Sequence, residues 1–393
     1  MSITGLKKIN NLWVRFTMVL VLIVILCYFL INVLNKKPII IGFVAQLTGN
    51  QAELGVQERN GVLLAVENIN SSGGIAGHKV KLIIRDDFGT TDEFHVVDRE
   101  LVNAGVVAII GHATSAQTLA GLKVTNPAKV LMIGSTVSTP ELSGLKDYFF
   151  RVYPSFNDSA QAFAQYIYKK DDIKRLAIIY DNDNAAYSKS YSETVANKIK
   201  SLGGIVTGEV SFSSVTQPDF SPLLLKLRES KAEGLLIIAS DVDTAVIAQR
   251  ARLLGWQIPL FTSSWAPTQN LIDNGGQAVE GLKFEQAYAL TSESTTLFDF
   301  QDHYKARFGN TSSFGAALAY DATMALSLGL KKTEGKPGGL MQALLENPNF
   351  SGLMGSFSFD TFGDVERPYY LSTIRNGEFV TLEKLTSTNS GGD

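Results

Sequence analysis

From residue 39 onward, short runs of valine, isoleucine and leucine alternate with longer amphipathic stretches. Uninterrupted apolar runs of this kind suit strands that are buried on both faces of a parallel sheet. The expected strands are residues 39–45, 80–85, 106–110, 130–133, 176–180, 235–239 and 259–261. The expected helices include residues 53–70, 159–169, 187–202 and 242–254. This alternation predicts an α/β fold with parallel sheets.

The length of the alternating region predicts two lobes rather than one. It covers roughly 300 residues, and a single hydrophobic core stops growing at about that size. Residues 151–155, which include Pro154, and residues 262–267 are the expected places where the chain leaves one sheet for another. We therefore expect two α/β lobes with crossings between them.

The N-terminal region contains an uncharged, mainly apolar run at residues 16–34. About 20 such residues cross a bilayer as a helix. We expect a transmembrane anchor at residues 16–35, with residues 1–15 in the cytoplasm and the rest of the chain outside it. A cleaved signal peptide is the alternative, but residues 31–35 lack the small residues that mark a cleavage site. Cys27 is then expected to face lipid or to be buried as an apolar residue.

Composition and motifs argue against several other classes of protein. One cysteine cannot form an internal disulfide, and no two of the four histidines lie three or four residues apart, so no metal site is expected. The net charge is −3 and no stretch is strongly basic, so no nucleic-acid partner is expected. Glycine-rich residues 73–77 follow a predicted helix and precede a predicted strand, the reverse of a phosphate-binding loop. Because no nucleophile elbow, Walker loop or zinc-protease motif is present, we expect neither an enzyme nor a cofactor.

Hydroxyl-bearing loops follow two of the expected strands, at residues 111–115 and 134–140. Ligands of open α/β sheets bind beyond the carboxyl ends of strands, where helix N-termini offer free N–H donors to a carboxylate. The same residues could equally be helix caps. Residues 240–244, with Asp241 and Asp243, pose a similar choice, because the helix dipole alone favours acids there and a ligand ammonium would as well.

Several short motifs, in a fixed order, resemble those of one family. They are QLTG at 46–49, NGVLLAVENIN at 60–70, GGIAG at 73–77, RDD at 85–87, GH at 111–112, TPEL at 139–142, YFFR at 148–151, DFS at 219–221, YKARFG at 304–309 and AYDA at 319–322. The chain resembles the leucine/isoleucine/valine-type (type I) periplasmic solute-binding proteins of ABC importers, over residues 39–383.

This resemblance implies two Rossmann-like lobes that are joined by three crossings and close on a ligand. The first lobe would comprise residues 38–152 and 266–355, and the second lobe residues 153–265 and 356–384. Residues 385–393 would form a flexible tail.

The resemblance also implies roles for loop residues. Ser115 matches a serine whose hydroxyl meets the ligand carboxylate, and Ser138 a threonine that contacts both the carboxylate and the amine. Thr136 matches a residue whose backbone carbonyl receives the ammonium. Asp243 matches a second-lobe glutamate that pairs with the ammonium, although Asp243 is one methylene shorter.

Three further residues are expected near the ligand's side chain. Leu54 stands where the family often has an aromatic residue, and Tyr187 follows a loop that is longer than usual. Trp265 either shapes the side-chain pocket or packs at the hinge. The function implied is capture of an α-amino acid, branched-chain or similar, for delivery to an ABC permease. The alternative is a sensing module that reports occupancy to a membrane partner.

Overall fold

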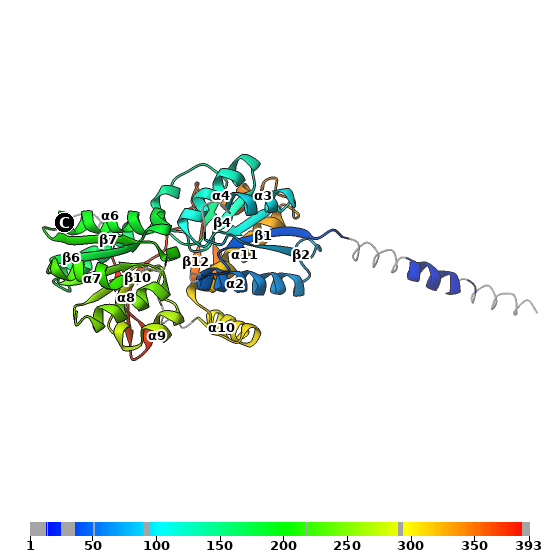
Figure 1. The fold of residues 1–393 in the computed structure, drawn as a ribbon. Helices are drawn as coiled ribbons and strands as arrows, with labels where there is room; N and C mark the ends of the chain where they lie inside the picture. The colour runs from blue at the N-terminus through cyan, green and yellow to red at the C-terminus, as the bar shows by residue number, and fades with distance from the viewer. Residues whose placement is uncertain are drawn as a thin grey trace, which may run out of the picture.

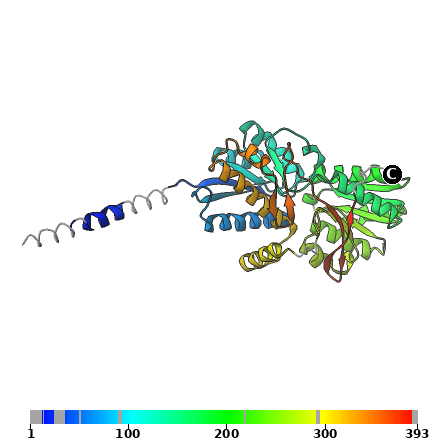
Figure 2. The same ribbon diagram turned by 180° about the vertical axis from the view of Figure 1, so that it is seen from behind.

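The computed structural model describes residues 13, 15–24, 36–49, 52–89, 94–216, 219–289 and 294–386 of the chain. Two α/β lobes lie side by side, each built on its own sheet (Figure 1). Figure 2 shows from behind that the C-terminal strands return to the second lobe.

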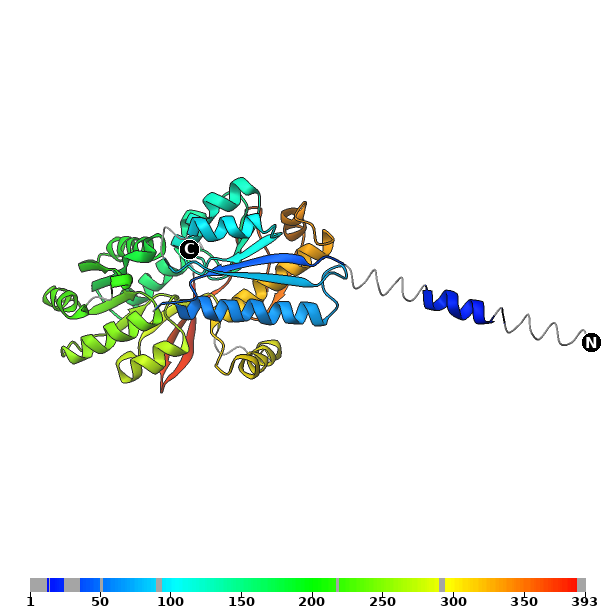
Figure 3. The ribbon, with the colours of Figure 1, turned by 45° about the vertical axis from the view of Figure 1, so that its right-hand side comes forward.

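The first lobe is built on a five-stranded parallel sheet with the order β2-β1-β3-β4-β5. Its strands are β1 (Ile39–Ala45), β2 (Val80–Asp86), β3 (Ala108–Gly111), β4 (Leu131–Gly134) and β5 (Phe149–Arg151). Its helices are α2 (Ala52–Ser71), α3 (Phe94–Asn103), α4 (Ser115–Ala128), α10 (Thr295–Phe308), α11 (Phe314–Lys332) and α12 (Leu340–Leu345). Helices α2 and α11 pack on one face of the sheet, and α3 and α4 on the other (Figure 3). Alternate residues of each strand fill these two cores, which explains the continuous apolar runs.

The second lobe is built on a seven-stranded sheet with the order β14-β13-β10-β9-β8-β6-β7. Its strands are β6 (Arg175–Asp181), β7 (Ile205–Phe212), β8 (Gly234–Ile238), β9 (Leu260–Thr262), β10 (Lys283–Gln286), β13 (Tyr369–Arg375) and β14 (Glu378–Leu385). Its helices are α5 (Asn157–Lys169), α6 (Ala185–Ser201), α7 (Phe220–Glu229), α8 (Asp241–Leu253) and α9 (Gln269–Gly275). Strands β6 to β10 are parallel, whereas β13 and β14 add in antiparallel fashion. The small hairpin β11 (Phe350–Gly352) and β12 (Gly355–Phe357) packs into the core of the first lobe.

The chain passes between the lobes three times, but two passages lie later in the sequence than expected. The predicted return at residue 266 is wrong because α9 and β10 belong to the second lobe, where β10 pairs with both β9 and β13. β10 reads Lys-Phe-Glu-Gln and lacks an apolar run, so the sequence pattern gave no sign of it. The last passage lies beyond 355, since Phe357, Phe359 and Val365 still pack in the first-lobe core.

The structure describes only part of the predicted N-terminal anchor. Residues 15–24 are helical, whereas residues 25–35 of the predicted anchor, with Cys27, lie outside the described residues. Within the described part of the chain, no helix is both long enough and apolar enough to cross a membrane. At the other end, Leu385 closes β14, so the predicted tail at 385–393 starts at least one residue later; residues 387–393 lie outside the described residues.

Candidate functional site

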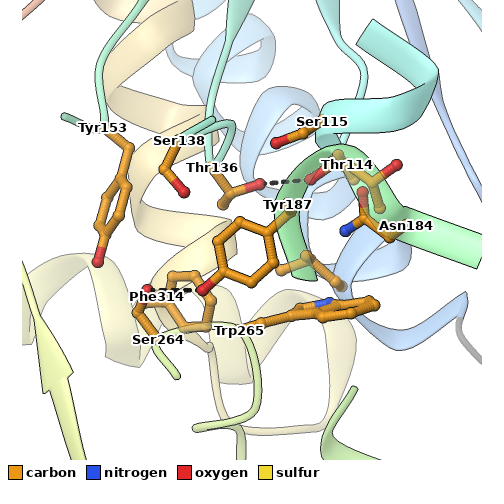
Figure 4. Close-up of a pocket in the computed structure, with 12 residues that line it drawn as sticks. Thr114, Ser115, Thr136, Ser138, Tyr153, Asn184, Tyr187, Ser264, Trp265 and Phe314 are labelled. Carbon is orange, nitrogen blue, oxygen red and sulfur yellow. Dashed lines mark hydrogen bonds between the residues drawn. The ribbon is translucent and has the colours of Figure 1, made fainter. Parts of the chain in front are cut away.

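A pocket lies between the two lobes, beyond the carboxyl ends of strands from both sheets (Figure 4). This is where ligands of open α/β sheets are expected. It is lined by Leu54, Ala113, Thr114, Ser115, Thr136, Ser138, Tyr153, Asn184, Tyr187, Ser264, Trp265 and Phe314. The lobes leave about 20 Å³ free inside it, room for about one water molecule.

The first-lobe wall presents two serine hydroxyls to the pocket. Ser115, at the start of α4, and Ser138, in the loop after β4, are both only 2% exposed. Among the described residues, neither hydroxyl makes a hydrogen bond. The N-cap residue Thr114 also leaves its hydroxyl unbonded. Free hydroxyls beside a helix N-terminus form a set of donors suited to an anion.

Thr136 has a bracing role in the same wall. Its hydroxyl lies 2.6 Å from Glu58 Oε1 and 2.8 Å from the carbonyl oxygen of Ala113. Burial of Glu58 raises the pKa of its carboxyl to about 8, against the opposing effect of the Thr136 hydrogen bond. The Thr136 side chain therefore connects the loops after β3 and β4 to helix α2.

The remaining walls of the pocket consist of aromatic side chains and uncharged polar side chains. The Tyr187 hydroxyl lies 3.4 Å from Ser264 Oγ, and the Tyr187 ring meets Trp265 edge-on at 5.8 Å between centroids. Trp265 lines the pocket and also packs against the cores of both lobes. Asn184 joins the lobes, because the backbone N–H of Ala116 donates to Asn184 Oδ1 at 3.2 Å.

Comparison with known proteins now assigns the chain to a family. The family model for periplasmic binding proteins matches residues 38–378. The chain belongs to the periplasmic binding protein family. It is 33% identical to the Leu/Ile/Val-binding protein BraC3 of Rhizobium johnstonii, over 89% of this chain and 95% of that protein. This makes it a binding protein of the leucine/isoleucine/valine type and, as predicted, not an enzyme.

Solved structures agree on the fold of this binding protein. The leucine-binding protein LivK of Thermotoga maritima matches with a TM-score of 0.81 and 26% identity, over 88% of this chain and 99% of that one. A solute-binding protein of R. palustris in complex with benzoate matches with a TM-score of 0.79 and 16% identity, over 89% of this chain and 97% of that one.

Six of the seven predicted site residues meet at the pocket, and Asp243 does not. The six are Leu54, Ser115, Thr136, Ser138, Tyr187 and Trp265. Asp243 lies in the first turn of α8, where its N–H and carboxylate both bond the hydroxyl of Ser240, at 3.3 and 3.1 Å. This reciprocal contact is a capping arrangement, so the expected pairing of Asp243 with a ligand ammonium is not supported.

Six lining residues of the binding protein were not among the predicted site residues. Ala113 and Thr114 lie in the loop at 111–115 that the sequence had pointed to, and the other four lie elsewhere. Asn184 and Ser264 follow strands β6 and β9, so the same rule that selected Ser115 could have found them. Tyr153 and Phe314 come from a lobe crossing and from the start of α11, and no local sequence signal marks them.

A buried charged cluster lies behind the Ser115 loop. His112 is fully buried, with Nδ1 2.7 Å from Asp87 Oδ2 and Nε2 3.2 Å from Asp98 Oδ2. Burial alone would lower the pKa of His112, but the carboxylates of Asp98 and Asp87 outweigh it and raise that pKa to about 10. The imidazolium thus holds helix α3 and the end of β2 against the loop that carries Ser115.

These buried groups predict that stability falls as pH rises from 6 to 9. Glu58 keeps its proton in the fold up to about pH 8 but loses it near 4.5 when unfolded, and His112 keeps its proton up to about pH 10 rather than 6.5. Between pH 6 and 9 the unfolded state therefore binds fewer protons than the folded state. For each group, the stabilisation is complete below its pKa in the unfolded chain and is lost as the pH approaches its pKa in the fold. Each group contributes up to ~1.4 kcal/mol per pH unit.

Chemical denaturation at pH 6, 7, 8 and 9 measures this effect. Glu58→Gln, which stays neutral, should lower the slope between pH 7 and 8. A free energy of unfolding that is constant or rises across this range would contradict the prediction.

Proposed function

We propose that this binding protein captures a small solute by its carboxylate group, between two lobes that close on it, and delivers it to the permease of an ABC importer. The observation that carries the proposal is the pair of unpartnered hydroxyls, Ser115 and Ser138, beside the N-terminus of α4. A charge-assisted hydrogen bond from each is worth ~1.5–3 kcal/mol. Closure removes water and strengthens these contacts.

The names of relatives suggest which solutes to test first. BraC3 and the Thermotoga protein are named for leucine, isoleucine or valine, so branched-chain and similar α-amino acids are one class. The same fold also holds benzoate in the R. palustris protein, so carboxylates without an amine are a second class.

We also propose that residues 16–35 anchor the protein in the membrane. Their uncharged, apolar composition suits a bilayer-spanning helix, with residues 1–15 in the cytoplasm and the pocket outside. An anchored binding protein meets its permease by diffusion within the membrane plane. Retention of the full chain in the membrane fraction after a carbonate wash supports the anchor, and release would contradict it.

Alanine substitutions test the carboxylate site. Ser115→Ala and Ser138→Ala should each weaken binding of the tightest ligand at least tenfold, because each removes a charge-assisted hydrogen bond of more than ~1.4 kcal/mol. Calorimetry on the full chain, with a panel of L-leucine, L-valine, L-phenylalanine, benzoate and 4-methylpentanoate, measures the dissociation constants.

Asp243→Ala is the control, since it removes a charge at the start of α8 without touching the pocket lining. Its affinity should stay within about twofold of the parent chain's. Unchanged affinity in both serine variants would refute the proposed site.

A further inference from the structure

The two ends of the pocket offer different chemistry to a ligand (Figure 4). The first-lobe end carries the free hydroxyls of Ser115 and Ser138 and the N-terminus of the 14-residue helix α4. The opposite end carries the rings of Tyr187 and Trp265 and the hydroxyl of Ser264. An anionic head group followed by an apolar body matches this gradient.

The two buried carboxyl groups nearest this pocket are engaged within its walls. Oε1 of Glu58 accepts the hydroxyl of Thr136 on the first-lobe side, while Oε2 has no hydrogen-bond partner among the described residues. Glu285, 1% exposed, accepts the hydroxyl of Tyr191 at 3.1 Å and is also bonded to Ser264. Burial raises the pKa of these two carboxyls to about 8 and about 7, so at pH 7 Glu58 is mostly neutral and Glu285 is about half ionised, behind the lining residue Ser264.

The acids at the start of α8 are also engaged. Asp241 accepts the hydroxyl of Thr268, and Asp243 is bonded to Ser240. The twelve lining residues that the described part of the chain contributes are all uncharged.

Binding of an α-ammonium group in such a pocket would be energetically unfavourable. It would lose its water of hydration on closure without meeting a carboxylate, which is costly for a buried charge. A carboxylate alone keeps hydroxyl and helix N-terminal donors, and its apolar body gains contact with the aromatic rings.

We propose that the site takes monocarboxylates that lack an α-ammonium group and have a branched or aromatic body, in preference to the corresponding amino acids. This inference rests on the proposed function and names the substrate class of the same site. It explains why hydroxyl donors lie at the end of the pocket that would hold the carboxylate. It also explains why the opposite end offers aromatic rings and no charged lining residue within the described part of the chain.

Matched ligand pairs test the inference on the unmodified full chain. The pairs are L-leucine with 4-methylpentanoate, and L-phenylalanine with 3-phenylpropanoate, which differ only in the α-ammonium group. Calorimetry at pH 7 should give a dissociation constant at least tenfold lower for the acid of at least one pair. Tighter binding of the amino acids in both pairs would overturn the inference and leave the proposed function standing. If no carboxylate of either kind binds, the proposed function itself fails.

A substitution in the second-lobe wall tests the inference independently. Ser264→Asp places a carboxylate on the second-lobe wall, across the pocket from Ser115 and Ser138 (Figure 4). Affinity for L-leucine relative to 4-methylpentanoate should rise at least tenfold. An unchanged ratio in a folded variant would contradict the idea that the uncharged wall sets the ligand class. If the variant does not fold, the comparison of pairs on the parent chain decides.

Discussion

Replacing Asp364 with alanine is expected to lower the free energy of unfolding by about 3–5 kcal/mol, the usual cost of leaving a buried charge without its partner. Asp364 Oδ1 lies 2.7 Å from Nε of Arg151, whose side chain is 1% exposed. Asp364 also accepts the backbone N–H of Gly144 at 2.8 Å. Removing the carboxylate leaves a guanidinium buried and a backbone donor unpaired.

The effect should reach the pocket as well. Arg151 donates to the carbonyl of Thr139 and the hydroxyl of Ser143, at 2.9 and 2.6 Å. These residues continue the loop that carries Ser138, so a displaced Arg151 would loosen that loop. We expect weaker ligand binding in addition to lower stability.

A surface ion pair provides the matched control. Arg85 and Glu100 lie 2.6 Å apart, with side chains that are 37% and 50% exposed. Glu100→Ala should cost less than about 1 kcal/mol, because water screens the pair. Urea denaturation of both variants measures the difference. Equal losses would contradict the view that burial makes the Asp364 contact important.

Most strands that the sequence predicted are buried apolar runs, and β2, whose residues are mostly half-buried, is the exception. The other strands were missed for different reasons. β5 and β10 are mostly buried, but they are short and contain charged residues. β7 at the sheet edge is partly exposed, and the last two strands form the hairpin of β13 and β14. That hairpin turns at Asn376–Gly377, with positive φ at both residues. An Asn-Gly pair between alternating residues is a hairpin signal that the apolar criterion overlooks. A search for both patterns would have placed the C-terminal strands.

The residues of the candidate site also differ in how well the sequence predicted them. The first-lobe hydroxyls follow strands, so the rule about strand ends selected the loops that carry Ser115 and Ser138, and the family resemblance singled out the two residues. Asp243 lies outside the pocket lining, which the sequence did not reveal because an acid three residues after Ser240 serves a helix cap and a ligand clamp equally well. Tyr153 and Phe314 reach the pocket only through the packing of whole lobes, which local pattern does not encode.

Gly61→Ala is expected to lower the free energy of unfolding by about 3 kcal/mol, at the upper end of the cost of overpacking. A Cβ at position 61 would stand 2.0 Å from the carbonyl oxygen of Ala316, at the contact between α2 and α11. The neighbour is backbone, so the two helices would have to move apart. The gain of about 0.5–1 kcal/mol that alanine usually brings within a helix is too small to offset this.

The same displacement should disturb the pocket, which makes Gly61 a link between core packing and binding. Helix α2 carries Leu54 and Glu58, and α11 begins at Phe314, so separating the helices moves the lining. Gly338→Ala is the control, because a Cβ there meets nothing within 4 Å and its φ is not positive; its stability should change by less than about 0.5 kcal/mol. Thermal denaturation and ligand titration of both variants measure the two effects. If Gly61→Ala matches the control in both, then α2 and α11 can separate without cost, and the NG motif at residues 60–61 does not reflect their close approach.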